Sequence, residues 1–123
     1  MDARRILKVS EAVKEELSEI VGFEMEDPRL AEVDVTDVLV SPDSRHASVR
    51  VAVRGDERQV KKVLEALEHA SGFLRRELAS RLQLRYVPEL HFAHDKNPDV
   101  DTRLDILLRR ARKTRAREDP SRG

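Results

Sequence analysis

Residues 33–54 read VDVTDVLVSPDSRHASVRVAVR, a stretch with the pattern of a β-hairpin. In its second half, Ala and Val alternate with other side chains, which is the period of a strand with one buried face. In its first half, the Val residues keep this period but shift by one position at Thr36-Asp37, which predicts a bulge. The Ser-Pro-Asp-Ser sequence between the halves has the composition of a turn. The stretch therefore predicts two antiparallel strands that bury one face.

Helical patterns flank the hairpin on both sides. Upstream, residues 6–20 carry apolar side chains at spacings of three and four, and Gly22 and Pro28 predict the end of that helix. Downstream, Asp56 and Gln59 resemble a capping box ahead of a second apolar stripe. We therefore expect one helix before the hairpin and another directly after it.

The second helical stripe crosses Ala70-Ser71-Gly72 and resumes as far as Leu82. A glycine in a helix interior costs about 1 kcal/mol relative to alanine. We therefore expect a kink or a break at Ala70, Ser71 and Gly72 in place of one continuous helix.

The remaining pattern completes the fold. Residues 88–94 alternate as a third strand, and the leucines of residues 103–113 are compatible with one more short helix. Three strands with helices on one face make a two-layer α+β sandwich. We expect a single domain over residues 1–110, followed by a basic, disordered tail over residues 111–123.

The composition limits the classes of function. The chain has no Cys, which excludes disulfides, thiolate metal sites and cysteine nucleophiles. Its four glycines form no phosphate-binding loop, and neither a Gly-x-Ser-x-Gly nor a His-Glu-x-x-His motif occurs. Without an apolar leader or a long uncharged run, the sequence predicts a cytoplasmic protein off the membrane. We expect no enzymatic activity, no cofactor and no small-molecule substrate.

His91, His94 and Asp95 are the best candidates for metal ligands. Residues three apart on a strand point to opposite faces, so the two histidines cannot share an ion without a bulge. The sequence therefore predicts no metal site. A small metal-dependent hydrolase that uses these three residues stays open as an alternative.

Arginine is the positive signal. Arg75, Arg76, Arg81 and Arg85 lie within a short segment, and Arg45, Arg50 and Arg54 line the outward edge of the second strand of the hairpin. Guanidinium groups bind phosphate bidentately and stack on bases, so this pattern favours nucleic-acid binding. Arg75 and Arg81 also flank the apolar stripe, and packing of their stems against the core explains them equally well. Residues 103–123 add a basic excess, with 8 of the 24 basic and 3 of the 24 acidic side chains.

Several local strings occur in one order along the chain. They are EDPRL at 26–30, VTDV at 35–38, VSPD at 40–43, FLRREL at 73–78, and LRYVPEL at 84–90 followed by Phe92 and Asp95. In this combination, over about residues 4–110, the sequence resembles the ribosome-binding factor A family. The members of that family are bacterial assembly factors of the small ribosomal subunit.

The resemblance implies a KH-like fold of the second type, in the order helix, strand, strand, helix, kink, helix, strand. The family has an Ala-x-Gly kink where other KH domains clamp RNA backbone with a Gly-x-x-Gly loop, and residues 70–72 match that kink. The implied role is binding of 16S rRNA within the free small (30S) subunit, with assistance to its late maturation and processing. We expect a monomer. The residues expected to contact RNA are Arg45, Arg75, Arg76, Arg81 and Arg85.

A protein–protein adaptor with a KH-like fold is the alternative function. Its contact face would be the acidic side of the first helix, which carries Glu11, Glu15, Glu16 and Glu19. Loss of binding on mutation of these carboxylates, with the arginines unimportant, would favour the adaptor.

Overall fold

The computed structural model describes residues 2–25, 27–30 and 32–118. The chain begins with α1 (Ala3–Glu19), capped by the Asp2 carboxylate, which accepts a hydrogen bond from Arg5 N at 2.8 Å. A side-chain oxygen at this position satisfies one of the backbone N–H groups that a helix start leaves unpaired. A π-helical turn (Ile20–Glu24) and a short 3₁₀ turn (Pro28–Leu30) then lead to the hairpin.

The hairpin consists of β1 (Val33–Val40) and β2 (His46–Val53), which pair antiparallel with Val40 opposite Ala47. The register shifts between Val35 and Asp37, so the predicted bulge is confirmed. The extra residue of the bulge offsets the one-position shift in the alternation of β1. The valines before the bulge and those after it are therefore buried on the same face of the sheet.

The third strand, β3 (Glu89–His94), pairs with β2 in parallel, with Glu89 opposite His46. In the described part of the chain the strand order is therefore β1-β2-β3. A parallel pair needs a long crossover connection, which α2 (Glu57–His69) and α3 (Ser71–Leu82) provide.

The break between α2 and α3 lies at Ala70, whose φ of −84° and ψ of −3° depart from the helical ψ. Gly72 follows in the first turn of α3. The start of α2 has the predicted capping box: Asp56 accepts from Gln59 N, and the Gln59 side chain accepts from Asp56 N, both at 3.0 Å. The predicted helix start is therefore confirmed.

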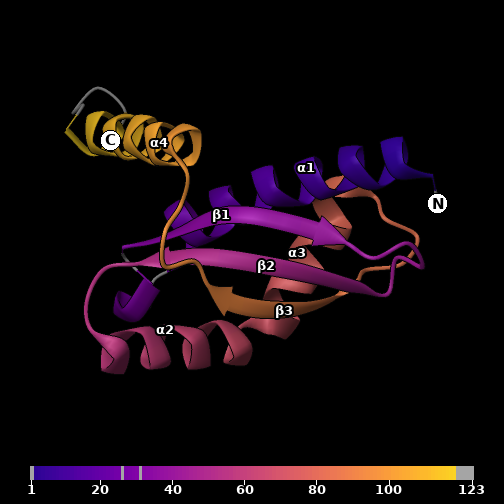
Figure 1. Cartoon of the computed structure of the whole chain (residues 1–123), viewed down its shortest axis with the longest axis horizontal. Helices are drawn as coiled ribbons and strands as arrows, with labels where there is room; N and C mark the ends of the chain where they lie inside the picture. Colours follow the sequence, from indigo (N-terminus) through magenta and orange to yellow (C-terminus); the bar gives the residue numbers. More distant parts are fainter. Residues whose placement is uncertain (1, 26, 31, 119–123) are drawn as a thin grey trace.

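Helices α1, α2 and α3 lie against one face of the sheet, and α3 passes behind the strands in Figure 1. Together they form the predicted two-layer α+β sandwich with the element order of a KH-like domain. The largest fully buried side chains include those of Leu17, Ile20, Leu30, Leu67, Leu74, Leu78, Val40, Val49 and Val51. The opposite face of β2 and β3 exposes His46, Ser48, Arg50, Glu89 and His91.

The C-terminal segment differs from the expectation of a disordered tail from residue 111. Helix α4 (Val100–Glu118) continues through residues 111–118, whereas residues 119–123 lie outside the described residues. The apolar pattern ends at Leu108, but the Arg, Ala and Lys residues that follow have high intrinsic helix propensity, and Pro120 comes only later. The helix therefore extends beyond its apolar stripe. No helix in the described ranges has an apolar stretch long enough to cross a bilayer.

Candidate nucleic-acid interface

Arg45 is held at the end of the β1–β2 turn. The Ser41 hydroxyl donates to Asp43 Oδ1 at 2.6 Å, and Arg45 N donates to the same oxygen at 3.0 Å. These two hydrogen bonds, that from Ser41 first, lower the pKa of Asp43 below its ordinary value because they favour the ionised carboxylate. These hydrogen bonds hold the turn in one conformation, and the Arg45 side chain at its end is exposed.

Arg85 lies in the loop of residues 83–88, between α3 and β3. Its guanidinium lies 5.5 Å from the centroid of the Tyr86 ring, a cation–π distance, and Tyr86 is 67% exposed. Glu89 N, just after this loop, donates to Arg45 O at 2.8 Å. The loop and the β1–β2 turn therefore lie side by side at one end of the molecule, at the right of Figure 1.

Arg75, on α3, is hydrogen-bonded to the backbone of this loop. Its Nη2 donates to Val87 O at 2.9 Å, and the side chain is half-buried. Arg75 therefore positions the segment that carries Arg85, and its guanidinium is not an open phosphate ligand.

Arg81 is engaged within the domain. Its Nη1 lies 3.2 Å from Glu16 Oε2 on α1, and its Nε lies 3.5 Å from Glu77 Oε2 on its own helix. The Arg81 side chain is 24% exposed. It therefore ties α3 to α1.

Arg76 is exposed on α3, one residue beyond Arg75. The five predicted arginines thus separate into two groups. Arg45, Arg76 and Arg85 are exposed, whereas Arg75 and Arg81 make contacts inside the domain. The sequence offered stem packing as an alternative for Arg75 and Arg81 but did not show these polar partners, because they are a backbone carbonyl in a loop and a carboxylate on another helix.

The segment Ala70-Ser71-Gly72 forms a direct helix-to-helix junction. Ala70 is both the C-cap of α2 and the N-cap of α3, and Leu74 N donates to Ala70 O at 2.9 Å. The glycines of the chain lie at 22, 55, 72 and 123, so this junction has no Gly-x-x-Gly loop. A backbone phosphate clamp of the usual KH kind cannot form from it.

The three metal candidates from the sequence do not converge. Asp95 accepts a hydrogen bond from the Thr36 hydroxyl at 2.8 Å and lies 3.8 Å from Arg50 Nη2. His91 is exposed on the open face, where its neighbours are His46 and Glu89, whereas His94 is half-buried. The sequence analysis did not identify His46 and Glu89 as neighbours of His91, because the parallel register of β2 and β3 brings them together.

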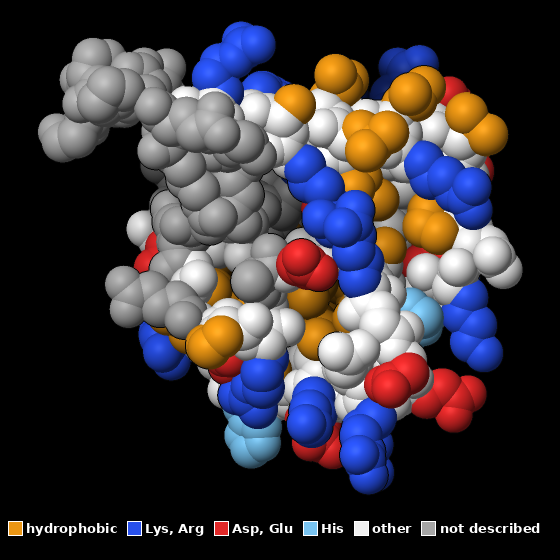
Figure 2. Space-filling model, turned by 90° about the vertical axis from the view of Figure 1, so that its left-hand side faces the viewer, with side chains coloured by type: hydrophobic (Ala, Val, Ile, Leu, Met, Phe, Trp, Pro, Cys, Tyr) orange, Lys and Arg blue, Asp and Glu red, His pale blue; other side chains and the backbone are white. Residues whose placement is uncertain are grey.

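Helix α4 presents apolar side chains to solvent. Its exposed large residues are Val100, Leu104, Leu107 and Leu108, each more than half exposed. In Figure 2, hydrophobic side chains lie in the open beside Lys and Arg side chains in the upper part of the view. The helix is held to the sheet by Arg110, which pairs with the Asp34 carboxylate and donates to Glu32 O at 3.3 Å.

The element order and the junction at residues 70–72, which lacks a Gly-x-x-Gly loop, define a KH-like domain of the second type with a helix break in place of the phosphate-clamping loop. The profile of the family described as "Ribosome-binding factor A" matches residues 5–108. The chain belongs to the ribosome-binding factor A family. A ribosome-binding factor A from Solibacter usitatus is 68% identical over 119 residues, which cover 97% of each chain. One from Heliobacterium modesticaldum is 45% identical over 88% of this chain and 89% of the relative.

Solved structures agree with this assignment. The crystal structure of ribosome-binding factor A from Thermus thermophilus superimposes with a TM-score of 0.57 and 31% identity, over 76% of this chain and 96% of that chain. A homology model of the Thermus thermophilus protein, fitted into a cryo-EM map of its complex with the 30S subunit, gives a TM-score of 0.55 and 32% identity. That match covers 76% of this chain and 93% of the other.

Proposed function

We propose that this protein is a ribosome assembly factor that binds the free small (30S) ribosomal subunit in the cytoplasm. It assists the late maturation and processing of 16S rRNA as a non-catalytic, monomeric RNA-binding protein. The observation that carries the proposal is membership of the ribosome-binding factor A family, of which a Thermus thermophilus member has been fitted into a 30S complex. Exposed arginines suit such a partner, because folded rRNA presents a dense array of phosphates.

The proposed contact surface is the end of the molecule where the β1–β2 turn meets the loop before β3. Arg45 and Arg85 project from these two neighbouring segments, and Arg76 adds a third exposed guanidinium from α3. Tyr86 offers an exposed ring on which a base could stack, beside the Arg85 guanidinium. Arg75 supports the surface through Val87 O, and Arg81 supports the packing of α3 on α1.

A pelleting assay tests the proposal. The protein is sedimented with free small subunits and, separately, with whole ribosomes, across a series of salt concentrations. We expect the parent protein to pellet with free small subunits and to dissociate steeply as salt rises, because each phosphate contact releases counterions. The triple variant with Arg45→Glu, Arg76→Glu and Arg85→Glu should bind weakly at every salt concentration.

The matched control is Arg58→Glu with Lys61→Glu, two exposed cations in the first turns of α2, which begins at the opposite end of the molecule from the β1–β2 turn in Figure 1. All variants should keep the parent melting temperature within a few degrees, since exposed substitutions usually change stability within about 0.5 kcal/mol. If the triple variant pellets as well as the parent, this surface is the wrong one. If the parent itself does not pellet with small subunits, the proposed function is wrong.

The contacts of the acidic face of α1 give the adaptor alternative less support than the sequence alone gave it. Glu16 is engaged by Arg81 at 3.2 Å, and Glu15 lies 3.8 Å from Arg109 Nη2. Two of the four carboxylates therefore already have partners within the domain. Glu11 and Glu19 are exposed, and charge reversal at these two positions in the same assay tests the adaptor.

A further inference from the structure

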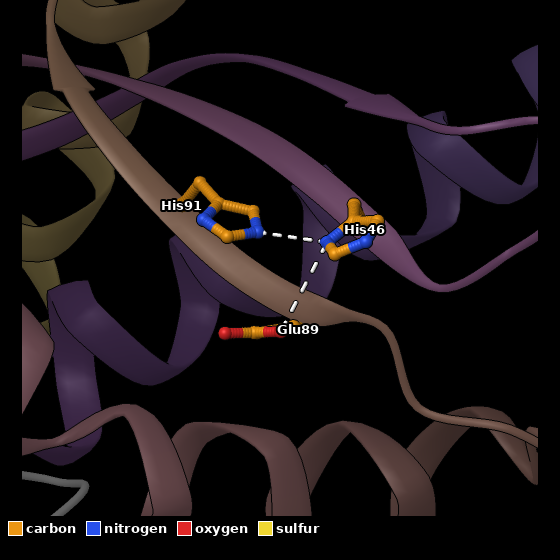
Figure 3. A group of neighbouring side chains, drawn as sticks. All are labelled: His46, Glu89 and His91. Atoms are coloured by element: carbon orange, nitrogen blue, oxygen red, sulfur yellow. Dashed lines mark hydrogen bonds and ion pairs between the residues drawn. The ribbon is translucent and has the colours of Figure 1, made fainter.

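Three side chains with metal-binding atoms meet on the open face of the sheet, next to Arg45. His46 begins β2, and Glu89 and His91 stand on β3, with side chains that converge in Figure 3. His46 Nδ1 lies 2.9 Å from His91 Nε2 and 3.9 Å from Glu89 Oε2. One ligand atom from each residue lies within 4.8 Å of the other two.

The backbone fixes this arrangement. In the parallel register, His46 is directly opposite Glu89, and His91 is the next residue on the same face of β3. The start of β2 is held by the turn, since His46 N donates to Ser41 Oγ at 3.1 Å and Ser41 N donates to His46 O at 2.8 Å. The three side chains therefore start from fixed Cα positions on two paired strands.

The distances suit one ion after small side-chain rotations. A tetrahedral Zn²⁺ with bonds of about 2.0–2.2 Å to nitrogen and carboxylate oxygen separates its ligand atoms by about 3.3 Å. The separations of His46 Nδ1 from the other two ligand atoms, 2.9 Å and 3.9 Å, lie on either side of this value. The His46 and Glu89 side chains are 52% and 61% exposed, so both can rotate without disturbing the core.

We propose that His46, Glu89 and His91 form a binding site for a divalent transition-metal ion, and that Zn²⁺ suits it best. Two imidazoles and one carboxylate match the ligand preference of Zn²⁺, whereas Mg²⁺ and Ca²⁺ prefer sites made of oxygen atoms alone. Three protein ligands leave a fourth position for water. The bound ion would link the start of β2 to the start of β3.

Calorimetric titration of the full chain with ZnCl₂, using protein without a histidine tag, tests the site. We expect one Zn²⁺ per chain and no saturable binding of Mg²⁺ under the same conditions. Loss of an outer-shell partner alone weakens metal sites by about 10–100-fold, so loss of a direct ligand should cost at least as much. His46→Gln and His91→Gln should each weaken binding to that extent, and Glu89→Gln should weaken it as well.

The two remaining histidines provide matched controls. His69 lies at the end of α2 and His94 is half-buried on β3, so His69→Gln and His94→Gln should bind Zn²⁺ like the parent. Zn²⁺ should raise the melting temperature of the parent and the controls but not of the His46→Gln, His91→Gln double variant, because a ligand that binds only the folded state stabilises it. Equal Zn²⁺ binding by the double variant, or no saturable binding by the parent, would overturn the proposal.

Discussion

Gly55 links the hairpin to α2 with a backbone conformation that other residues rarely adopt. Its φ is +122°, and a Cβ built there would lie 1.7 Å from Gln59 Oε1, the atom that completes the capping box of α2. An alanine would therefore strain the backbone and displace the cap together.

We expect Gly55→Ala to lower the free energy of unfolding by about 1–3 kcal/mol, the usual cost of a strained backbone position. Urea denaturation followed by circular dichroism measures the change. The matched control is Gly72→Ala: a Cβ at Gly72 would meet only Arg76 Nη1, at an ordinary 3.5 Å. That variant should gain about 0.5–1 kcal/mol, because alanine restricts the unfolded chain and favours the helix. Equal stabilities of the two variants would contradict this account.

At the scale of single elements, the polar anchor of α4 on the sheet is Arg110, and a second, longer contact of 3.8 Å joins Arg109 to Glu15 of α1. Arg110 pairs with Asp34, whose side chain is 15% exposed, whereas the leucines of α4 face solvent. Removal of the anchor leaves the Asp34 carboxylate without this partner and leaves α4 with little apolar contact to the sheet.

We expect Arg110→Ala to release α4 and to leave the rest of the domain folded. Hydrogen exchange should show protection lost in residues 103–110 and retained in β1, β2 and α1, since elements with few buried contacts open locally. Arg112→Ala, a neighbouring exposed arginine on the same helix, is the control and should leave exchange unchanged. Uniform loss of protection throughout the domain would contradict the local role of Arg110.

The elements differ in how far the sequence predicts them. Alternation and its shift at Thr36-Asp37 predicted the hairpin and its bulge, because period and phase are local properties. The direction of β3 was not predictable, since an alternating strand pairs equally well either way and the α2–α3 crossover decides. In the candidate site, the clustering of positive charge in the sequence pointed to the five arginines. It could not show that Arg75 and Arg81 are held by groups on other elements, nor that His46 stands beside His91.

At the scale of the whole molecule, positive charge is uneven along the chain. Residues 112–123 contain five basic and two acidic side chains, and the side chains of Arg112 and Arg115 are exposed. A segment with this charge adds to the attraction of a polyanion.

We expect truncation after residue 111 to leave the melting temperature within a few degrees of the parent value and to reduce affinity for the small subunit. Because fewer counterions are released, the dependence of affinity on salt should also become shallower. Pelleting across a salt series, beside a thermal melt, measures both effects. A large drop in melting temperature would mean that this end of α4 is part of the folded core.

The parallel pairing of β2 with β3 also governs the order in which the chain can fold. The β1–β2 hairpin closes a short turn, whereas His46 and Glu89 are paired across the whole of α2 and α3. Bringing distant residues together costs chain entropy before their contacts provide any stabilisation, so local pairs form sooner. During synthesis, the hairpin and α1 can associate while β3 is still inside the ribosome that is making it. The nascent domain then exposes one edge of β2 until its last strand arrives.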